Sequence, residues 1–540
     1  MTNLWWQDAV VYQIYPKSFK DSNNDGIGDI KGIISKPDYL KDLGVDVLWL
    51  CPVYRSPEVD NGYDISDYLD INPKFGTMED MDRLIRQADQ RGMKIIMDLV
   101  INHTSDRHPW FLESKDKTGP YRNYYYWRED DGKGTPSNWT GFFGGKTRSK
   151  DPDTGDWYLH LFSKEQPDLN WHHPAVMEEI KSVMKFWPDK GIAGFRYDVI
   201  NVIWKDSLEN GRFKLILKGS EHYLSRPGSH EILKALRKDV LSRSDCFTVG
   251  ETVFITPEEA RKYTLPEKKE PDMIFYFEHM ETDQILVKWF KRKFRPERLF
   301  KTLIKWQKEL PWNANYLENH DRPRSVSRFG NVEKYWRESA KMPGMLLMTL
   351  RGTPFLYQGQ ELGMTGFVFH SMEDIKDVES IQIEALAKKL LIPEKLRKKI
   401  IFSTSRDHAR TPFQWSDQKH AGFSESTPWI KVNRNYVRIN QENQSKDPDS
   451  VFAFYKRLIA FRKKSTALKE GSFTPLYYDK KTFIYERNHE QESLLVLLNF
   501  SDKPSKVKYA GECLLSNYNR KTFDGMLHPW EGILLSTTPR

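Results

Sequence analysis

The segment Gly194-Phe195-Arg196-Tyr197-Asp198 decides the fold of this 540-residue chain, because it is a short β-prone run that ends on a carboxylate. Two other runs have the same form. One is Phe247–Glu251, and the other leads into Glu318-Asn319-His320-Asp321. In a barrel of parallel strands, functional groups gather at the carboxyl ends of the strands. Strands that finish on acids therefore predict a barrel whose rim holds a carboxylate cluster.

Outward from these runs, eight strand-length segments alternate with helix-like segments. Near-continuous apolar strands that alternate with helices are typical of a parallel sheet buried on both faces. We therefore predict the α/β class and a (β/α)8 TIM barrel. The expected strands are Val10–Tyr15, Val47–Pro52, Lys94–Val100, Gly194–Val199, Phe247–Glu251, Met273–Phe277, Asn313–Glu318 and Thr353–Gln358.

The remaining segments predict two additions to the barrel. Residues 104–171, after the third strand, are too long and too irregular for a simple loop and predict an inserted subdomain. The barrel then comprises 1–103 and 172–467, with an excursion at about 365–415, and 468–540 predict an antiparallel β-domain. Its expected strands are Phe473–Tyr478, Thr482–Arg487, Ser493–Asn499, Val507–Tyr509 and Gly532–Ser536.

Composition is ordinary for a globular protein, with 39% hydrophobic and 29% charged residues. A net charge of +8 over 540 residues is weak evidence for an anionic partner. The basic, aromatic stretch Lys288–Arg295 could suit nucleic acid. However, apolar residues continue at helical spacing after this stretch, which favours a helix with an apolar stripe and a solvated face. Lys395–Lys399 has the same interpretation. We expect no nucleic-acid partner and favour a monomer.

Three distant cysteines, Cys51, Cys246 and Cys513, form no disulfide or metal-ligand pattern. The N-terminus shows no signal segment, and no apolar run approaches the roughly 20 residues needed to span a bilayer. We therefore expect a cytoplasmic protein without a membrane partner.

The strand-ending acids suit glycoside hydrolysis. Converging carboxylates repel each other, so at least one should hold a proton near neutral pH. A retaining glycosidase uses one ionised and one protonated carboxyl group about 5 Å apart. Neighbouring strands lie about 4.8 Å apart, so Asp198 and Glu251 can meet that distance. Arg196 points to the same side of its strand as Asp198 and could hold it ionised. The alternative is that these acids are rim carboxylates in salt bridges.

Five motifs resemble the signatures of glycoside hydrolase family 13, the α-amylase family, over nearly the whole chain. They are Asp98–His103, Gln166–Asn170, Gly194–Asp198, Val249–Glu251 and Asn319–Asp321. The resemblance implies Asp198 as nucleophile, Glu251 as general acid/base and Asp321 as transition-state stabiliser. It also implies that His103, Arg196 and His320 line the same subsite, which would bind a small oligosaccharide.

Within that family the chain is most similar to the group of oligo-1,6-glucosidases, dextran glucosidases and trehalose-6-phosphate hydrolases. Asp60 and Tyr63 match the residues that hold the non-reducing glucose, and Arg410 matches the arginine that pairs with that aspartate. Such a pair closes the pocket and implies an exo-acting α-glucosidase. Phe162 and Gln166 match pocket positions of the same group.

Val199, which follows the nucleophile, resembles enzymes that accept α-1,6 bonds. Valine is stiff and bulky, so it can select how the next sugar enters. The alternative is that Val199 only packs against the barrel and does not influence the linkage. We expect short α-1,6-linked isomalto-oligosaccharides as substrates.

The segment Asp21–Asp29 places oxygen-bearing side chains at alternate positions with a glycine sixth, as at the start of an EF-hand loop. Gly32 stands at the twelfth position where an EF-hand has glutamate, so this is not an EF-hand. The family resemblance implies structural Ca2+ held by Asp21, Asn23, Asp25, the Ile27 carbonyl and Asp29. The alternative is a polar turn without metal.

At several positions this chain carries residues that differ from those usual in this group of enzymes. Lys146-Thr147-Arg148 replaces an aromatic surface, and Gln360-Glu361 replaces two glutamates. Lys146, Arg148 and Lys150 raise a phosphorylated disaccharide as a rival substrate, since such cations bind phosphate. Sucrose isomerase and a non-enzymatic barrel protein are further alternatives. Val199 argues against the isomerase, and the complete set of three acids argues against the non-enzyme.

Overall fold

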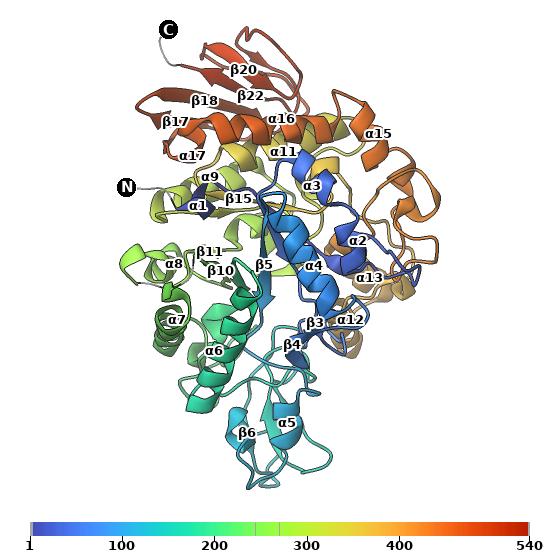
Figure 1. Cartoon of the computed structure of the whole chain (residues 1–540), viewed down its shortest axis with the longest axis vertical. Coiled ribbons are helices and arrows are strands. Elements are labelled where there is room, and N and C mark those ends of the chain that lie inside the picture. Colours follow the sequence, from blue (N-terminus) through green and yellow to red (C-terminus); the bar gives the residue numbers. More distant parts are fainter. Residues whose placement is uncertain (1–3, 244, 269, 538–540) are drawn as a thin grey trace.

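The computed structural model describes residues 4–243, 245–268 and 270–537. Its centre is an eight-stranded parallel sheet in the order β11-β10-β9-β5-β2-β1-β15-β14, and β11 contacts β14, so the sheet closes into the predicted barrel (Figure 1). The strands are β1 Val11–Ile14, β2 Val47–Leu50, β5 Lys94–Leu99, β9 Gly194–Tyr197, β10 Phe247–Glu251, β11 Met273–Phe275, β14 Ala314–Asn315 and β15 Thr353–Tyr357.

Helices surround the barrel, and their sequences show why they form there. Thr77 caps the first turn of α4 by accepting from the Asp80 N–H, and its apolar face buries Met81, Leu84 and Ala88 at helical spacing. The barrel helices are α2 Ile30–Ile34, α3 Pro37–Leu43, α4 Met78–Asp89, α6 Pro174–Asp189, α7 Pro227–Asp239, α8 Pro257–Thr264, α9 Pro296–Glu309, α11 Trp336–Thr349 and α16 Val451–Lys464.

Most of the barrel strands end one to three residues earlier than predicted, where the chain turns into the barrel rim. β9 stops at Tyr197, and β14 covers only two residues, so Glu318 lies beyond it. The Glu318 carboxylate instead accepts from the Ser325 N–H at 2.9 Å and pairs with Arg324 at 3.1 Å. The Glu318 side chain is therefore held by polar contacts at the rim and not as part of a strand.

The helix predicted from Lys288 is wrong. Strand β13 Val287–Lys291 pairs antiparallel with β12 Gln284–Ile285, and α9 begins only at Pro296. The Lys288 side chain forms an ion pair with Glu379 at 2.5 Å, so a long-range contact outweighs the local spacing. The helix expected around Lys395–Lys399 is confirmed as part of α13 Glu394–Thr404.

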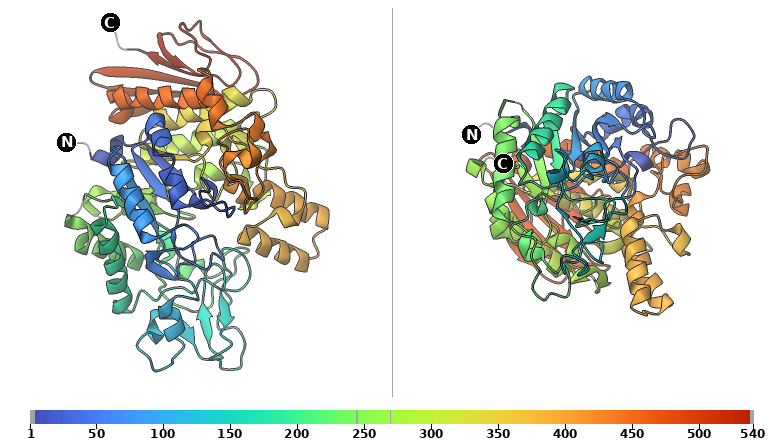
Figure 2. Two further views of the ribbon diagram at one scale, coloured as in Figure 1. Left: turned by 45° about the vertical axis from the view of Figure 1, so that its right-hand side comes forward. Right: turned by 90° about the horizontal axis from the view of Figure 1, so that it is seen from below.

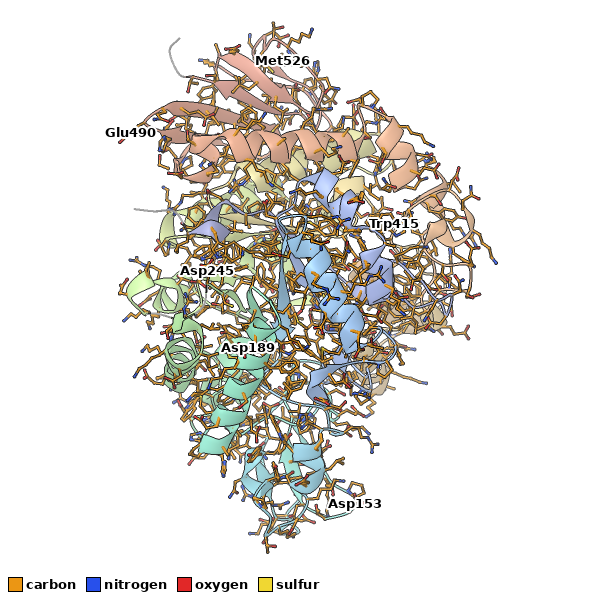
Figure 3. The ribbon with its side chains drawn as sticks, in the orientation of Figure 1. Asp153, Asp189, Asp245, Trp415, Glu490 and Met526 are labelled. Atoms are coloured by element: carbon orange, nitrogen blue, oxygen red, sulfur yellow. The ribbon has the colours of Figure 1, made fainter. Side chains whose placement is uncertain are left out.

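Residues 104–171 contain the short helix α5 Pro109–Glu113 and a sheet ordered β6-β8-β7, made of Trp127–Arg128, Trp157–Leu159 and Arg148–Lys150. A small ribbon, β3 Tyr54–Arg55 with β4 Asp67–Ile71, precedes them. This segment and the C-terminal domain occupy opposite ends of the molecule, as the labelled Asp153 and Met526 indicate (Figure 3).

The C-terminal domain is an antiparallel sheet in the order β16-β17-β18-β22-β20. The strand predicted at Val507–Tyr509 is wrong, since β19 Ser505–Lys506 pairs with β21 Met526–Leu527 just before it. A further strand, β20, was missed by the sequence prediction. The five sheet strands are Ser472–Tyr478, Thr482–His489, Glu492–Asn499, Gly532–Ser536 and Glu512–Ser516.

The excursion after β15 carries an arm of two helices, α12 Val378–Lys389 and α13, at the side of the barrel (Figure 2). The remaining helices are α1 Trp5–Asp8, α10 Ser325–Phe329, α14 Asp407–Arg410, α15 Gln441–Lys446 and α17 Thr466–Lys469. Within the described ranges, none of the helices has the length and apolar character needed to cross a bilayer.

Candidate active site

Arg196 joins the acids at the ends of two neighbouring strands. Its Nη1 lies 2.6 Å from Asp198 Oδ1 and 2.6 Å from Asp98 Oδ1, and its Nη2 lies 2.5 Å from Glu251 Oε2. Arg196 does therefore pair with Asp198, as predicted from their spacing. One guanidinium bridging both acids holds the two carboxyl groups close together, as a retaining mechanism requires.

Burial sets the protonation of this pair. It raises the pKa of Glu251 to about 8 and that of Asp198 to about 6, while Arg196 opposes both shifts. A hydrogen bond between the two carboxyl groups further raises the pKa of Glu251 and lowers that of Asp198. Near neutral pH, Glu251 therefore holds a proton and Asp198 is mostly ionised.

Asp321 faces the pocket and stays ionised. Burial alone would raise its pKa, but His320, Arg406 and Arg410 hold the pKa below its usual range. Burial also lowers the pKa of His320 to about 3, so that imidazole is neutral near pH 7. The two arginines therefore supply the charge, at 3.3 Å and 2.8 Å from Asp321 Oδ1.

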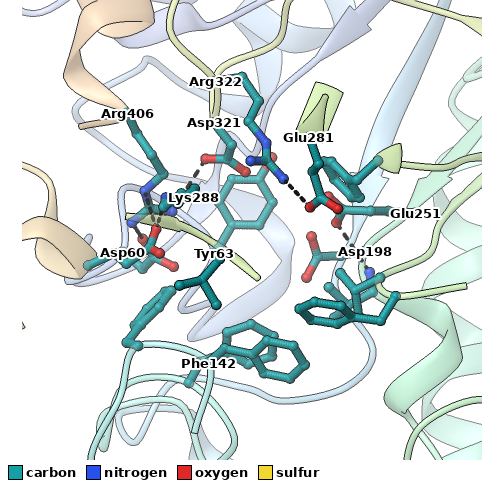
Figure 4. A pocket seen from close by; sticks show the side chains of 18 of the residues that line it. Asp60, Tyr63, Phe142, Asp198, Glu251, Glu281, Lys288, Asp321, Arg322 and Arg406 are labelled. Carbon is teal, nitrogen blue, oxygen red and sulfur yellow. Dashed lines mark hydrogen bonds and ion pairs between the residues drawn. The ribbon is translucent and has the colours of Figure 1, made fainter. Parts of the chain in front are cut away.

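Asp60 closes the opposite end of the pocket through an arginine that the sequence assigned wrongly. Arg406 Nη2, and not Arg410, pairs with Asp60 Oδ1 at 2.8 Å (Figure 4). Arg406 Nε also pairs with Asp377 at 2.7 Å, which ties the start of α12 to this end of the pocket. Arg410 lies behind, where it donates to Asp321 and to the His320 carbonyl.

The other predicted sugar-binding residues form one connected wall. The Tyr63 ring stacks on His320 with centroids 5.2 Å apart, and His103 Nε2 contacts the Tyr63 carbonyl at 3.1 Å. Gln166 Nε2 lies 3.1 Å from His103 Nε2, and Phe162 packs against the His103 ring at 5.1 Å. All these residues except His320 line the pocket. The predicted residues Arg196, His320 and Arg410 lie behind its surface.

Val199 lines the pocket in a strained backbone conformation. Its φ of 37° and ψ of 48° are left-handed, which is rare for a β-branched residue. The conformation turns its N–H toward Glu251 Oε2, at 3.4 Å. Strain of this kind concentrates at functional sites.

Sequence reasoning missed several residues that line the pocket, among them Arg322 and Lys288. Arg322 pairs with Glu281 at 3.2 Å, and Lys288 pairs with Glu379, so these cations are already neutralised. Lys288 was missed because it was assigned to a solvated helix. Arg322 directly follows the predicted residue Asp321 in the sequence, and this adjacency was the signal that could have identified Arg322 as a pocket residue.

None of the three cations proposed for phosphate lines this pocket, and two of them, Arg148 and Lys146, are already bound elsewhere. Arg148 is only 4% exposed and donates to the Tyr126 carbonyl at 3.0 Å. Lys146 donates to the Thr135 hydroxyl at 2.6 Å. A phosphate at the catalytic pocket would therefore meet none of them.

The Asp21–Asp29 loop is folded around its own carboxylates. Asp21 accepts from the backbone N–H groups of Asn23, Asn24 and Gly26, and the Asn23 amide donates to Asp25 at 3.1 Å. The Asp29 carboxylate caps α2 by accepting from the Gly32 N–H. The side-chain and backbone atoms that this loop would offer to a metal are all oxygens, which is the ligand type that calcium prefers. Elsewhere too, the part of the chain that the structure describes has no cluster of three His, Cys, Asp or Glu residues suited to a metal.

Comparison with known proteins settles the family. The model of the α-amylase catalytic domain matches residues 13–471. The chain belongs to the α-amylase family. As a member of this family of glycoside hydrolases, it is an enzyme that acts on oligosaccharides.

Curated members of the α-amylase family match the chain over almost its full length. An oligo-1,6-glucosidase of Parageobacillus thermoglucosidasius is 48% identical, with 98% of each chain covered. A glucan 1,6-α-glucosidase of Streptococcus pneumoniae is 42% identical, with 98% of this chain and 99% of the relative covered.

Solved structures of the family share the fold. A trehalose-6-phosphate hydrolase of Bacillus licheniformis has a TM-score of 0.92 at 41% identity, covering 99% of this chain and all of that one. An isomaltulose synthase of a Klebsiella species has a TM-score of 0.96 at 38% identity, with the same coverage. The fold therefore accommodates several reactions on glucosides, and the site must distinguish among them.

Proposed function

We propose that the protein is a retaining, exo-acting α-glucosidase that releases glucose from short α-1,6-linked oligosaccharides. The observation that carries this proposal is the bridged pair Asp198 and Glu251, one acid ionised and one protonated. Asp198 would attack the anomeric carbon while Glu251 protonates the leaving oxygen, and Glu251 would then activate water. Asp321 would stabilise the positive charge that develops on the sugar.

The exo mode rests on the closed end of the pocket. Asp60 and Arg406 form a buried ion pair there, with side chains only 6% exposed. A glucose whose hydroxyls bind this pair has no room for a further sugar beyond it. Charged partners of this kind form strong hydrogen bonds to hydroxyls.

Linkage preference is the testable part of this proposal. We expect kcat/KM for isomaltose or panose to exceed that for maltose, and Val199→Thr to shift the ratio toward maltose by about tenfold, or about 1.4 kcal/mol. Threonine keeps the branched shape of Val199, so the left-handed backbone is equally strained in both proteins. The measurement is kcat/KM for isomaltose, panose, maltose, sucrose, trehalose and trehalose-6-phosphate with both enzymes.

The panel also tests the rival substrates. A wild-type preference for maltose of tenfold or more would contradict the role of Val199 and leave the mechanism standing. A preference for trehalose-6-phosphate would replace the substrate assignment. The ion pair Arg322–Glu281 argues against that outcome, because it neutralises a cation on the leaving-group side of the pocket.

We further propose that Ca2+ binds the Asp21–Asp29 loop through Asp21, Asn23, Asp25, the Ile27 carbonyl and Asp29, in a structural role. EGTA should then lower the melting temperature, and added Ca2+ but not Mg2+ should restore it. Binding of this kind adds roughly 2.7 kcal/mol to stability at 100 times the Kd. Asp21→Asn should remove the response to EGTA. A wild-type melting temperature that EGTA leaves unchanged would contradict the site.

We also propose that the protein acts as a monomer in the cytoplasm. The cysteines Cys51 and Cys513 are free thiols, and a reducing compartment would keep them so.

A further inference from the structure

A second, mostly apolar cavity of about 610 Å3 adjoins the catalytic pocket, which measures about 200 Å3. We call it the apolar groove. Its lining residues come from the inserted subdomain, the loop at 215–217, strand β13 and the helical arm α12–α13. The side chains that matter here are Trp139, Leu215, Phe254, Trp289, Ile383 and Leu386.

The groove is continuous with the pocket on the leaving-group side. Phe142, Phe254, Val287 and Trp289 line both cavities. Phe254 follows Glu251, the proposed acid, by three residues, whereas Asp60 and Arg406 close the other end of the pocket (Figure 4). An aglycone that departs from the bound glucose on the Glu251 side therefore enters the groove.

The groove offers little to a sugar. Glu384 and Arg397 pair with each other at 2.8 Å, and Lys146 is bound to the Thr135 hydroxyl. Sugar hydroxyls buried against the remaining apolar side chains would lose hydrogen bonds with water. Large apolar side chains are exposed there instead, including Leu215 at 84% and Leu390 at 66%. Contiguous exposed apolar surface marks a binding site.

We propose that the apolar groove binds an apolar aglycone, so that the enzyme also hydrolyses medium-chain alkyl α-glucosides. This inference rests on the proposed α-glucosidase function. In the reaction the bond between the anomeric carbon and the aglycone oxygen breaks, and Glu251 protonates that oxygen to release the alcohol. Water, deprotonated by Glu251, then frees glucose from Asp198, so one water is consumed for each glucose and alcohol formed.

An alkyl chain fits the observations better than a second protein chain. The groove opens into the pocket through shared residues, so its occupant is attached to the bound glucose. Burial of each methylene group is favourable and needs no partner of fixed geometry. The arm also contacts the inserted subdomain beside the groove, since a Cβ added at Gly144 would lie 3.2 Å from Leu386 Cδ2.

The test compares kcat/KM for octyl and methyl α-D-glucosides, below the concentration at which octyl glucoside forms micelles. Methanol and octanol are similar leaving groups, so the ratio reports binding of the chain and not the chemistry. We expect octyl to exceed methyl by tenfold or more, which corresponds to burial of about two methylene groups. Equal values for the two substrates would overturn the proposal.

Variants in the groove lining, one in the loop at 215–217 and one on the arm, make the test specific to the groove. Leu215→Ser combined with Leu386→Ser should lower the octyl-to-methyl ratio at least fivefold and leave isomaltose hydrolysis within twofold of the wild type. Leu391→Ser is the matched control, because Leu391 is 88% exposed beside Leu390 and does not line the groove. A ratio that falls equally in the control would overturn the assignment.

The outcomes separate this inference from the proposed function. Hydrolysis of isomaltose without any preference for octyl glucoside contradicts only the groove. Failure to hydrolyse any α-glucoside contradicts the proposed function itself. Melting temperatures of the variants exclude unfolding as the cause of a lowered ratio.

Discussion

Asp198→Asn is expected to lower kcat on isomaltose on the order of 10^4-fold or more, because the amide cannot form the proposed covalent glucosyl intermediate. KM should change little, since the asparagine keeps the shape of the side chain and can still accept from Arg196. The measurement is steady-state glucose release. Asp153→Asn serves as a control, since Asp153 lies at the far tip of the inserted subdomain with a side chain 70% exposed (Figure 3).

Chemical rescue distinguishes a nucleophile from a residue that merely supports the fold. In Asp198→Gly the lost carboxylate leaves space beside the anomeric carbon, on the face that Asp198 occupies. Added azide should therefore restore turnover of α-glucosyl fluoride and yield β-glucosyl azide. A stable, folded variant that azide cannot rescue, or a wild-type rate in Asp198→Asn, would contradict the mechanism.

Glu251→Gln is expected to have an effect that depends on the leaving group. Loss of a general acid costs typically 10^2–10^4-fold where the departing oxygen needs a proton, as with isomaltose. Fluoride needs no such proton, so kcat/KM for α-glucosyl fluoride, which reports the first step alone, should fall about tenfold or less, although the second step still needs Glu251 as the base. Equal losses on both substrates would contradict the role of Glu251 as the acid. Glu281→Gln is a control, because Glu281 lines the same pocket and its carboxylate pairs with Arg322.

The same pair predicts the pH profile of the wild type. Activity requires ionised Asp198, whose pKa is about 6, and protonated Glu251, whose pKa is about 8. As pH falls below the first value the nucleophile gains a proton, and as pH rises above the second the acid loses one. The profile of kcat/KM against pH should therefore be bell-shaped. Its two apparent pKa values describe the coupled pair Asp198 and Glu251 together. Glu251→Gln should lose the alkaline limb on α-glucosyl fluoride.

Local pattern was enough to predict the barrel and the rim acids. Parallel strands present their carboxyl ends at one edge, so an acid that ends a strand must lie at that edge whatever the loops do. Asp198 and Glu251 follow directly from this rule, and so does the pairing of Arg196 with Asp198. The irregular ends were harder to predict. β14 is only two residues long, and Lys288 lies on a strand that pairs with β12, where helical spacing favours a helix.

The sequence by itself determined the eight strands, the order of the acids along them and the family of the enzyme. Only the tertiary structure decided which arginine meets Asp60, how Arg148 is buried and where the apolar groove runs. The physical reason is the separation of the partners. Asp60 and Arg406 are 346 residues apart, so their contact depends on how distant loops pack over the barrel rim. Strand periodicity acts within a few residues, whereas side-chain pairing depends on which surfaces the finished fold brings together.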